Sequence, residues 1–122
     1  MQKTTTVDIL GTKYIVHIGV DPAKDEKITD LYGYCSASER KIVIVDMDKL
    51  AEWDGHTTKA KEKHQKETLR HEILHAFFDE SGLRSSCLNY SGSWALNEEM
   101  VDWFAIQYPK IKKVYQILNC ED

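Results

Sequence analysis

The clearest chemistry in this sequence lies in two histidines four positions apart with a glutamate directly after the first: His71, Glu72 and His75. On a helix, residues i and i+4 share a face, so both imidazoles can offer a ring nitrogen to one metal ion. Glu72 points about 100° away from His71, close enough to hold a water molecule without taking a metal position. This pattern is typical of the zinc site of a metallopeptidase.

The motif lies in the segment 59–81, which predicts one long helix because no proline interrupts it and Gly82 follows where a helix would stop. Apolar residues cover most of the circumference of its second half, so we expect that half to be buried. They are Ile73, Leu74, Ala76, Phe77 and Phe78. If the motif has arisen by chance, the two histidines are instead surface residues or hydrogen-bonded core residues.

A catalytic zinc site needs a third protein ligand and one open position. The segment 97–108 predicts a second helix, which begins at an asparagine N-cap and ends at Pro109. Glu98 and Asp102 lie one turn apart, so Glu98 can bind the metal while Asp102 orients a ligand histidine by a hydrogen bond. Glu99, about 100° away, is the rival ligand. Acidic residues also favour the first turn of a helix without any metal.

The other histidines are weaker candidates. His64 shares the stripe of His71 but lies about 10 Å further along the helix axis, too far to bind the same ion. His56 falls in a predicted loop, and His17 in a strand pattern, where a place on the sheet surface is expected. Phe78 and Ser81 occupy the positions where the elongated metzincin motif has glycine and histidine. The sequence is therefore not that of a metzincin.

Taken together, the motif at 71–75 and the downstream Asn97-Glu98-x-x-x-Asp102 resemble the glutamate-zincin arrangement. More narrowly, Glu98-x-x-Val101-x-x-Phe104-Ala105 is similar to the second-helix motif of the ImmA/IrrE family of small bacterial and phage metallopeptidases, which usually has alanine where this chain has Val101. The resemblance covers both helices and, loosely, the segments 32–35 and 41–44. It implies that His71, His75 and Glu98 hold zinc and that Glu72 is the general base and acid.

Length and composition predict one compact domain over residues 1–122. The 20 acidic and 16 basic side chains leave a net charge of −4, so nothing in the electrostatics supports nucleic-acid binding. No apolar stretch is long enough to span a membrane, and the first residues lack a signal-peptide core, so we expect a cytoplasmic protein. Cys35, Cys87 and Cys120 contain no Cys-x-x-Cys pair, which favours reduced structural thiols.

Alternating residues predict two hairpins before the motif helix. The first joins strands 7–10 and 13–18 through a Gly11-Thr12 turn, and the second joins 31–36 and 41–46. A short helical or irregular connector is expected between them, and a last helix is expected to open at Pro109. The predicted fold class is α+β. We expect a minimal zincin-like fold, with a small twisted, mostly antiparallel sheet packed on the motif helix and a second helix carrying Glu98.

The sequence thus predicts a zinc-dependent metallopeptidase that hydrolyses peptide bonds, and the family resemblance favours a specific regulatory protein as substrate. An extended peptide could pair with the edge of the 31–46 hairpin. Tyr90, Tyr108 and His56 are candidates for a second group that stabilises the oxyanion. The alternative is a non-catalytic zinc-containing binding or regulatory module of phage or bacterial origin.

Overall fold

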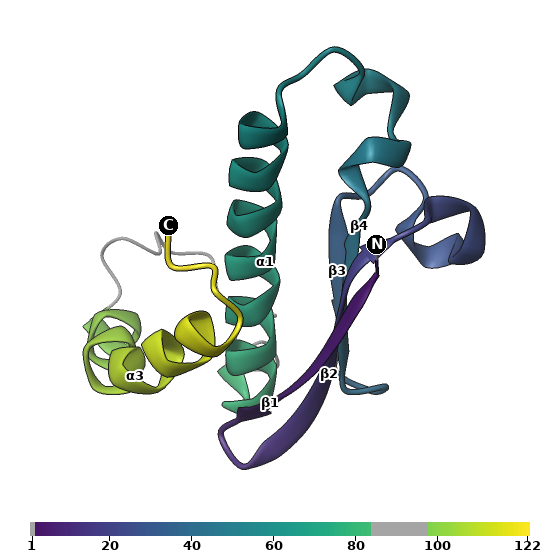
Figure 1. Ribbon diagram of the computed structural model, residues 1–122. Helices are drawn as coiled ribbons and strands as arrows, with labels where there is room; N and C mark the ends of the chain where they lie inside the picture. The colour runs from purple at the N-terminus through teal and green to yellow at the C-terminus, as the bar shows by residue number, and fades with distance from the viewer. Residues whose placement is uncertain (1, 84–97) are drawn as a thin grey trace.

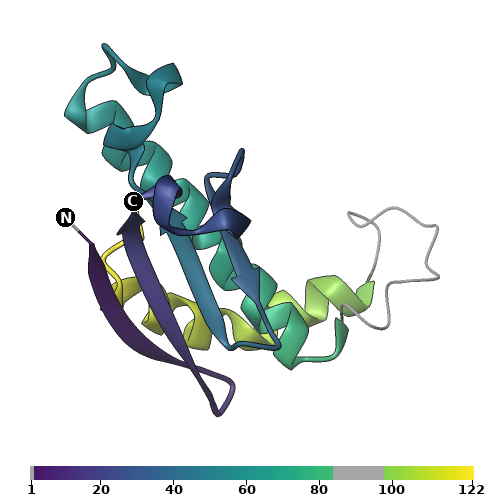
Figure 2. The same ribbon diagram turned by 90° about the vertical axis from the view of Figure 1, so that its right-hand side faces the viewer.

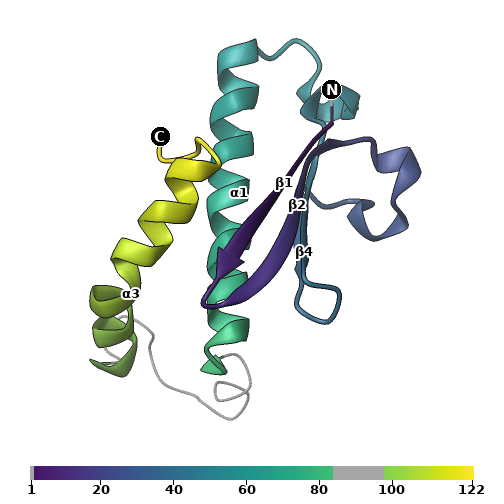
Figure 3. The same ribbon diagram turned by 60° about the horizontal axis from the view of Figure 1, so that its bottom comes forward.

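The computed structural model describes residues 2–83 and 98–122, without the side chains of Glu98, Glu99, Val101, Asp102 and Ala105. Its strands are β1 (Lys3–Ile9), β2 (Thr12–Val20), β3 (Gly33–Ser36) and β4 (Lys41–Val45), and its helices are α1 (Thr58–Glu80) and α3 (Glu98–Ile117). The fold is α+β, as predicted: a four-stranded, mostly antiparallel sheet with two helices packed on it. Figures 1 and 3 show α1 and α3 on the same side of the sheet.

Both predicted hairpins are present, and the order of the strands is β1-β2-β4-β3. The hairpins β1–β2 and β3–β4 are antiparallel, whereas β2 and β4 pair in parallel at the centre of the sheet. β3 is therefore an edge strand. Figure 2 shows α1 passing behind β3 and its neighbour β4. Ile42, Val43, Ile44 and Val45 of β4 are all buried, which confirms the expectation for this β-branched run.

The turn of the first hairpin lies one residue earlier than predicted. Leu10 and Gly11 form it, with φ angles of 53° and 92°, and Thr12 already belongs to β2. Positive φ at both central residues matches a type I′ turn, whose twist suits the flanking strands. The carboxylate of Asp8 accepts a hydrogen bond from the Gly11 amide at 2.6 Å, which helps hold this register.

The main core lies between the sheet and the two helices. Alternate residues of β1 and β2 enter it, as the period of a strand requires. α1 contributes Leu69, Ile73, Ala76 and Phe77, which recur at helical spacing along one face. A smaller buried cluster lies on the opposite side of the sheet and consists of Val20, Ile28, Val43, Val45 and Met47. The connectors cover it, and two short 3₁₀ helices occupy the segment that was predicted to be helical or irregular.

α1 begins one residue earlier than predicted and ends at Glu80, and Thr57 caps it by accepting a hydrogen bond from the Ala60 amide at 3.1 Å. The expectation that its second half is buried was wrong in part. His71 and His75 are exposed, whereas Glu72 between them is buried. Only one face of α1 packs on the sheet, so the burial of each residue depends on its phase relative to that sheet rather than on its apolar neighbours.

The prediction that Pro109 separates two helices was wrong: α3 is one helix from Glu98 to Ile117, with Pro109 inside it. A proline in a helix interior loses one hydrogen bond and costs about 3 kcal/mol. Apolar side chains are buried on both sides of it, and each large one stabilises the fold by about 1.5–3 kcal/mol. These side chains are Met100, Ile111, Val114 and Leu118. Tertiary packing therefore outweighs the local preference of proline.

Because Pro109 is exposed, replacing it should restore a helical hydrogen bond without disturbing the core. We expect Pro109→Ala to stabilise the protein by about 2 kcal/mol, the helix penalty less the small gain that proline makes by stiffening the unfolded chain. The midpoint of urea unfolding should rise with an unchanged m-value. Lys112→Ala, at another exposed position of α3, should change stability by less than about 0.5 kcal/mol. A lower midpoint for Pro109→Ala would instead show that the packing of α3 needs the proline.

No helix in the described ranges combines the length and the apolar character that a membrane span requires.

Candidate metal centre and groove

The two motif histidines project from the exposed face of α1, one turn apart. Their Nε2 atoms are 3.1 Å apart, and their ring centroids are 4.7 Å apart. Two nitrogens that bind one tetrahedral zinc ion at 2.0–2.1 Å would lie about 3.3 Å from each other. The observed separation is therefore close to that of two nitrogens bound to one ion. At 3.1 Å the same pair can also share a proton in an N–H···N hydrogen bond, which depends on the tautomers.

Glu72 faces a different environment from the histidines on either side of it. Its side chain is only 8% exposed, and burial raises the pKa of its carboxyl group above the usual value, while the nearby His71 opposes that shift. Its carboxylate makes no hydrogen bond within the described part of the chain. A carboxyl group with a raised pKa and spare acceptor capacity is suited to take up and release a proton.

Glu72 and His71 also line a groove of about 340 Å³ between α1 and the start of β3. Such a volume is at the lower end of the range for ligand pockets. The other lining residues are Tyr32, Gly33, Glu67 and Thr68. Figure 1 shows the ribbons of β3 and α1 side by side. The motif helix and the edge strand thus form opposite walls, as expected if the second hairpin borders the site.

Gly33 sets how closely the edge strand approaches α1. A Cβ atom at this position would lie 2.9 Å from the carbonyl oxygen of Val43 and 3.0 Å from Cγ2 of Thr68. It would also lie 2.9 Å from Cδ1 of Ile44. The first of these atoms belongs to the backbone of the neighbouring strand and cannot move aside alone. A side chain at residue 33 would therefore widen the groove or distort the sheet.

We expect Gly33→Ala to destabilise the protein by about 1–3 kcal/mol, the usual cost of overpacking. Urea unfolding of the variant would measure this loss. The double variant Gly33→Ala, Thr68→Ser should recover part of it, because serine lacks Cγ2 but keeps the hydroxyl group that donates to the His64 carbonyl oxygen. Equal stability of Gly33→Ala and wild type would mean that the close approach of β3 to α1 is not required.

The predicted third ligand, Glu98, is the first residue of α3. The side chains of Glu98, its rival Glu99 and Asp102 lie outside the described residues, so these predictions stay open. Among the described side chains, no group of three or more His, Cys, Asp or Glu residues is placed to hold a metal ion.

A hydrogen bond and two aromatic contacts of Trp103 attach the first half of α3 to the end of α1. Trp103 donates a hydrogen bond from Nε1 to Oγ of Ser81 at 3.1 Å. Its ring meets those of Phe77 and Phe78 edge to face, at centroid distances of 6.4 and 5.1 Å. These contacts keep the helix that carries Glu98 beside the C-terminal end of the motif helix.

The three remaining histidines pack against aromatic rings or lie on the sheet, away from the histidine pair. His64 packs between Tyr32 and Trp53, at centroid distances of 4.5 and 4.8 Å. Its Nε2 is buried and has no hydrogen-bond partner among the residues that the structure describes. His56 also packs against Trp53, at a centroid distance of 4.5 Å, and does not line the groove. His17 lies on β2 within 3.2 Å of the Thr4 hydroxyl, as expected for a residue on the sheet surface.

The other candidates from the sequence have mixed outcomes. Tyr108 is exposed on α3, and Tyr90 lies outside the described residues. Cys35 and Cys120 form no disulfide bond with each other, and burial raises the pKa of Cys120 to about 11. Cys87 lies outside the described residues.

Sequence reasoning missed Glu67 and Thr68 as groove residues. Their spacing could have identified them, because residues four and three positions before His71 lie next to it on the same face of the helix.

No family model matches this sequence, and no curated protein or solved structure matches it either.

Proposed function

We propose that this protein is a zinc-dependent metallopeptidase with a minimal zincin-like fold. The observation that carries the proposal is the approach of the His71 and His75 Nε2 atoms to 3.1 Å, on the stretch of α1 that also carries the buried Glu72. The motif supplies two imidazole ligands and an acid–base group on one helix, which is the set that metallopeptidases of this type use. The groove between α1 and β3 supports the proposal, because it provides room for a ligand next to two of these side chains.

The donor set suits zinc. His71 and His75 would hold the ion through Nε2, Glu98 would be the third ligand, and Asp102 would fix the orientation of a ligand histidine. Two imidazoles and one carboxylate with one open position favour zinc among the common intracellular ions. When bound, zinc would supply Lewis acidity, which acidifies a water molecule and polarises a peptide carbonyl group.

Glu72 would be the general base and acid that transfers the proton of the attacking water. Its buried carboxyl group has a raised pKa, so the carboxylate is a stronger base than one in water. It would accept a proton from the attacking water and deliver it to the nitrogen of the leaving amine, which completes hydrolysis of the peptide bond. Its position on the groove wall, adjacent to His71, is compatible with both transfers.

β3 would hold the substrate. As an edge strand it has one side unpaired by any strand of the described sheet, and a peptide can add to such an edge through backbone hydrogen bonds. An extended peptide on this edge would run along the groove past Glu72. The family resemblance favours one regulatory protein as the substrate, so incubation with a mixture of unfolded proteins should leave them largely uncut.

Metal content per chain is the experiment that tests the site. We expect about one zinc ion per wild-type chain after zinc loading and dialysis, and well under half of that in His75→Ala and in Glu98→Ala, because each removes one of three ligands. Elemental analysis by mass spectrometry measures it. His17→Ala, which removes a histidine from the sheet surface, is the matched control and should keep the full amount.

Two other outcomes are informative. If Glu98→Ala retains the zinc while Glu99→Ala loses it, the third ligand is Glu99 and the proposed function stands. A wild-type protein that holds no zinc after loading would remove the basis of the peptidase proposal and leave the histidine pair as a hydrogen-bonded surface feature.

A further inference from the structure

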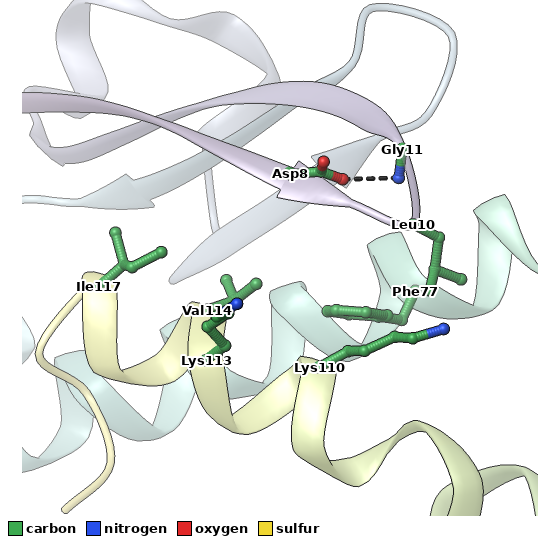
Figure 4. A pocket seen from close by; sticks show the side chains of 8 residues that line it. All are labelled: Asp8, Leu10, Gly11, Phe77, Lys110, Lys113, Val114 and Ile117. Atoms are coloured by element: carbon green, nitrogen blue, oxygen red, sulfur yellow. Dashed lines mark hydrogen bonds between the residues drawn. The ribbon is translucent and has the colours of Figure 1, made fainter.

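A second cavity lies between the turn of the β1–β2 hairpin and α3, and it shares no lining residue with the groove at Glu72. Its volume is about 460 Å³, which is within the range of pockets that bind small molecules. Figure 4 shows it with the hairpin on one side, α3 on the other and Phe77 of α1 between them. It is lined by Asp8, Leu10, Gly11, Phe77, Lys110, Lys113, Val114 and Ile117.

Half of these residues have apolar side chains. Phe77 and Val114 are buried members of the main core, and Leu10 packs against that core from the hairpin turn. Ile117 lies at the end of α3 with 57% of its surface exposed. The cavity therefore offers a continuous apolar surface that reaches from the core to solvent.

The charges at the rim have an uneven distribution. Lys110 and Lys113 lie three residues apart on α3, so their side chains share one face of the helix. Neither ammonium group makes an ion pair with any described residue, although the chain as a whole carries a net charge of −4. Asp8 is the opposing charge, and its carboxylate is engaged by the Gly11 amide on the hairpin side, where Figure 4 draws it.

We propose that this cavity binds a small amphiphilic monocarboxylate. The aliphatic chain would lie against Leu10, Phe77 and Val114, and the carboxylate would lie between the ammonium groups of Lys110 and Lys113. The lining has two positive charges and one negative charge, so it favours an anion over a cation with the same tail. Transfer of the tail from water to the apolar walls would provide the driving force, and the two charge-assisted hydrogen bonds would select the head group.

Octanoate is a suitable probe, with octylamine and octanol as ligands that have the same tail and a different head group. Titration into the full chain, followed by NMR of the methyl groups, should shift the signals of Leu10, Val114 and Ile117. We expect octanoate to bind with a dissociation constant on the order of 1 mM, as is usual for a ligand of this size. Octylamine should bind at least several-fold more weakly.

Charge variants separate this site from general affinity for fatty chains. Lys110→Glu and Lys113→Glu together should weaken octanoate about tenfold at low salt, because each change replaces an attraction by a repulsion. They should leave octanol unchanged. Lys112→Glu alters the same helix with a side chain that does not line the cavity, and it should have little effect. All three lysines are exposed, so the variants should fold.

The proposal would be overturned by either of two results. One is the absence of shifts at Leu10, Val114 and Ile117 at millimolar octanoate. The other is equal binding of octanoate to wild type and to the doubly substituted protein. Neither result depends on zinc or on peptidase activity, so the proposed function is tested separately.

Discussion

Glu72→Gln is expected to abolish peptide hydrolysis while leaving the zinc content at the wild-type level. Glutamine has almost the same shape as glutamate but cannot accept the proton of the attacking water. General acid–base catalysis typically contributes 10²–10⁴-fold to a rate, so activity should fall by about that factor. Zinc should remain because Glu72 is not among the proposed ligands, and the loss would then be assigned to chemistry rather than to folding.

The measurement is digestion of a peptide library by the zinc-loaded protein, with new peptide termini identified by mass spectrometry. Glu62→Gln is the matched control, because Glu62 is exposed on the same helix and does not line the groove. It should retain cleavage. If the wild-type protein binds zinc but generates no new termini, the peptidase proposal fails, and a zinc-containing binding module becomes the better explanation.

Phe77→Ala is expected to cause the largest loss of stability of any single truncation considered. The side chain is 1% exposed and lies in the main core formed by the sheet, α1 and α3. Truncating a buried phenylalanine costs about 3–5 kcal/mol, from lost transfer free energy and the remaining cavity. A domain of this size has a total stability on the order of 10 kcal/mol, so the variant should lose about a third to a half of it.

Thermal unfolding followed by circular dichroism should show a fall in Tm of about 10–20 °C for Phe77→Ala. Phe78→Ala is the matched control. Phe78 is half-buried and packs edge to face on Trp103 and Phe104, so a smaller loss of about 1–2 kcal/mol is expected. A similar loss in both variants would mean that α1 does not present its Phe77 face to the core as described.

Local features were well predicted from the sequence. The bounds of α1, the two hairpins and the buried β-branched strand all follow from short-range rules of capping, periodicity and turn formation. The approach of His71 to His75 is also local, because helix geometry alone places i and i+4 side chains together. Even the misplaced turn at Leu10-Gly11 was wrong by only one residue.

Tertiary structure decided the features that depend on contacts between distant segments. The parallel pairing of β2 with β4 leaves β3 at the edge of the sheet, and no local pattern in either hairpin specifies that order. Packing on both sides of Pro109 keeps α3 continuous against the preference of proline. The approach of β3 to α1 gives Gly33 its role, because the atoms that a side chain would meet come from β4 and α1.

The candidate site combines both kinds of information. By itself the sequence determined the histidine pair and the glutamate between them, since one turn of helix is enough to bring these groups together. Only the tertiary structure decided that the histidines face solvent while Glu72 is buried on the wall of a groove, because burial depends on which face of α1 meets the sheet. The same holds for the cavity with Lys110 and Lys113, whose walls come from segments a hundred residues apart in the chain. Such walls meet only when the whole chain has folded.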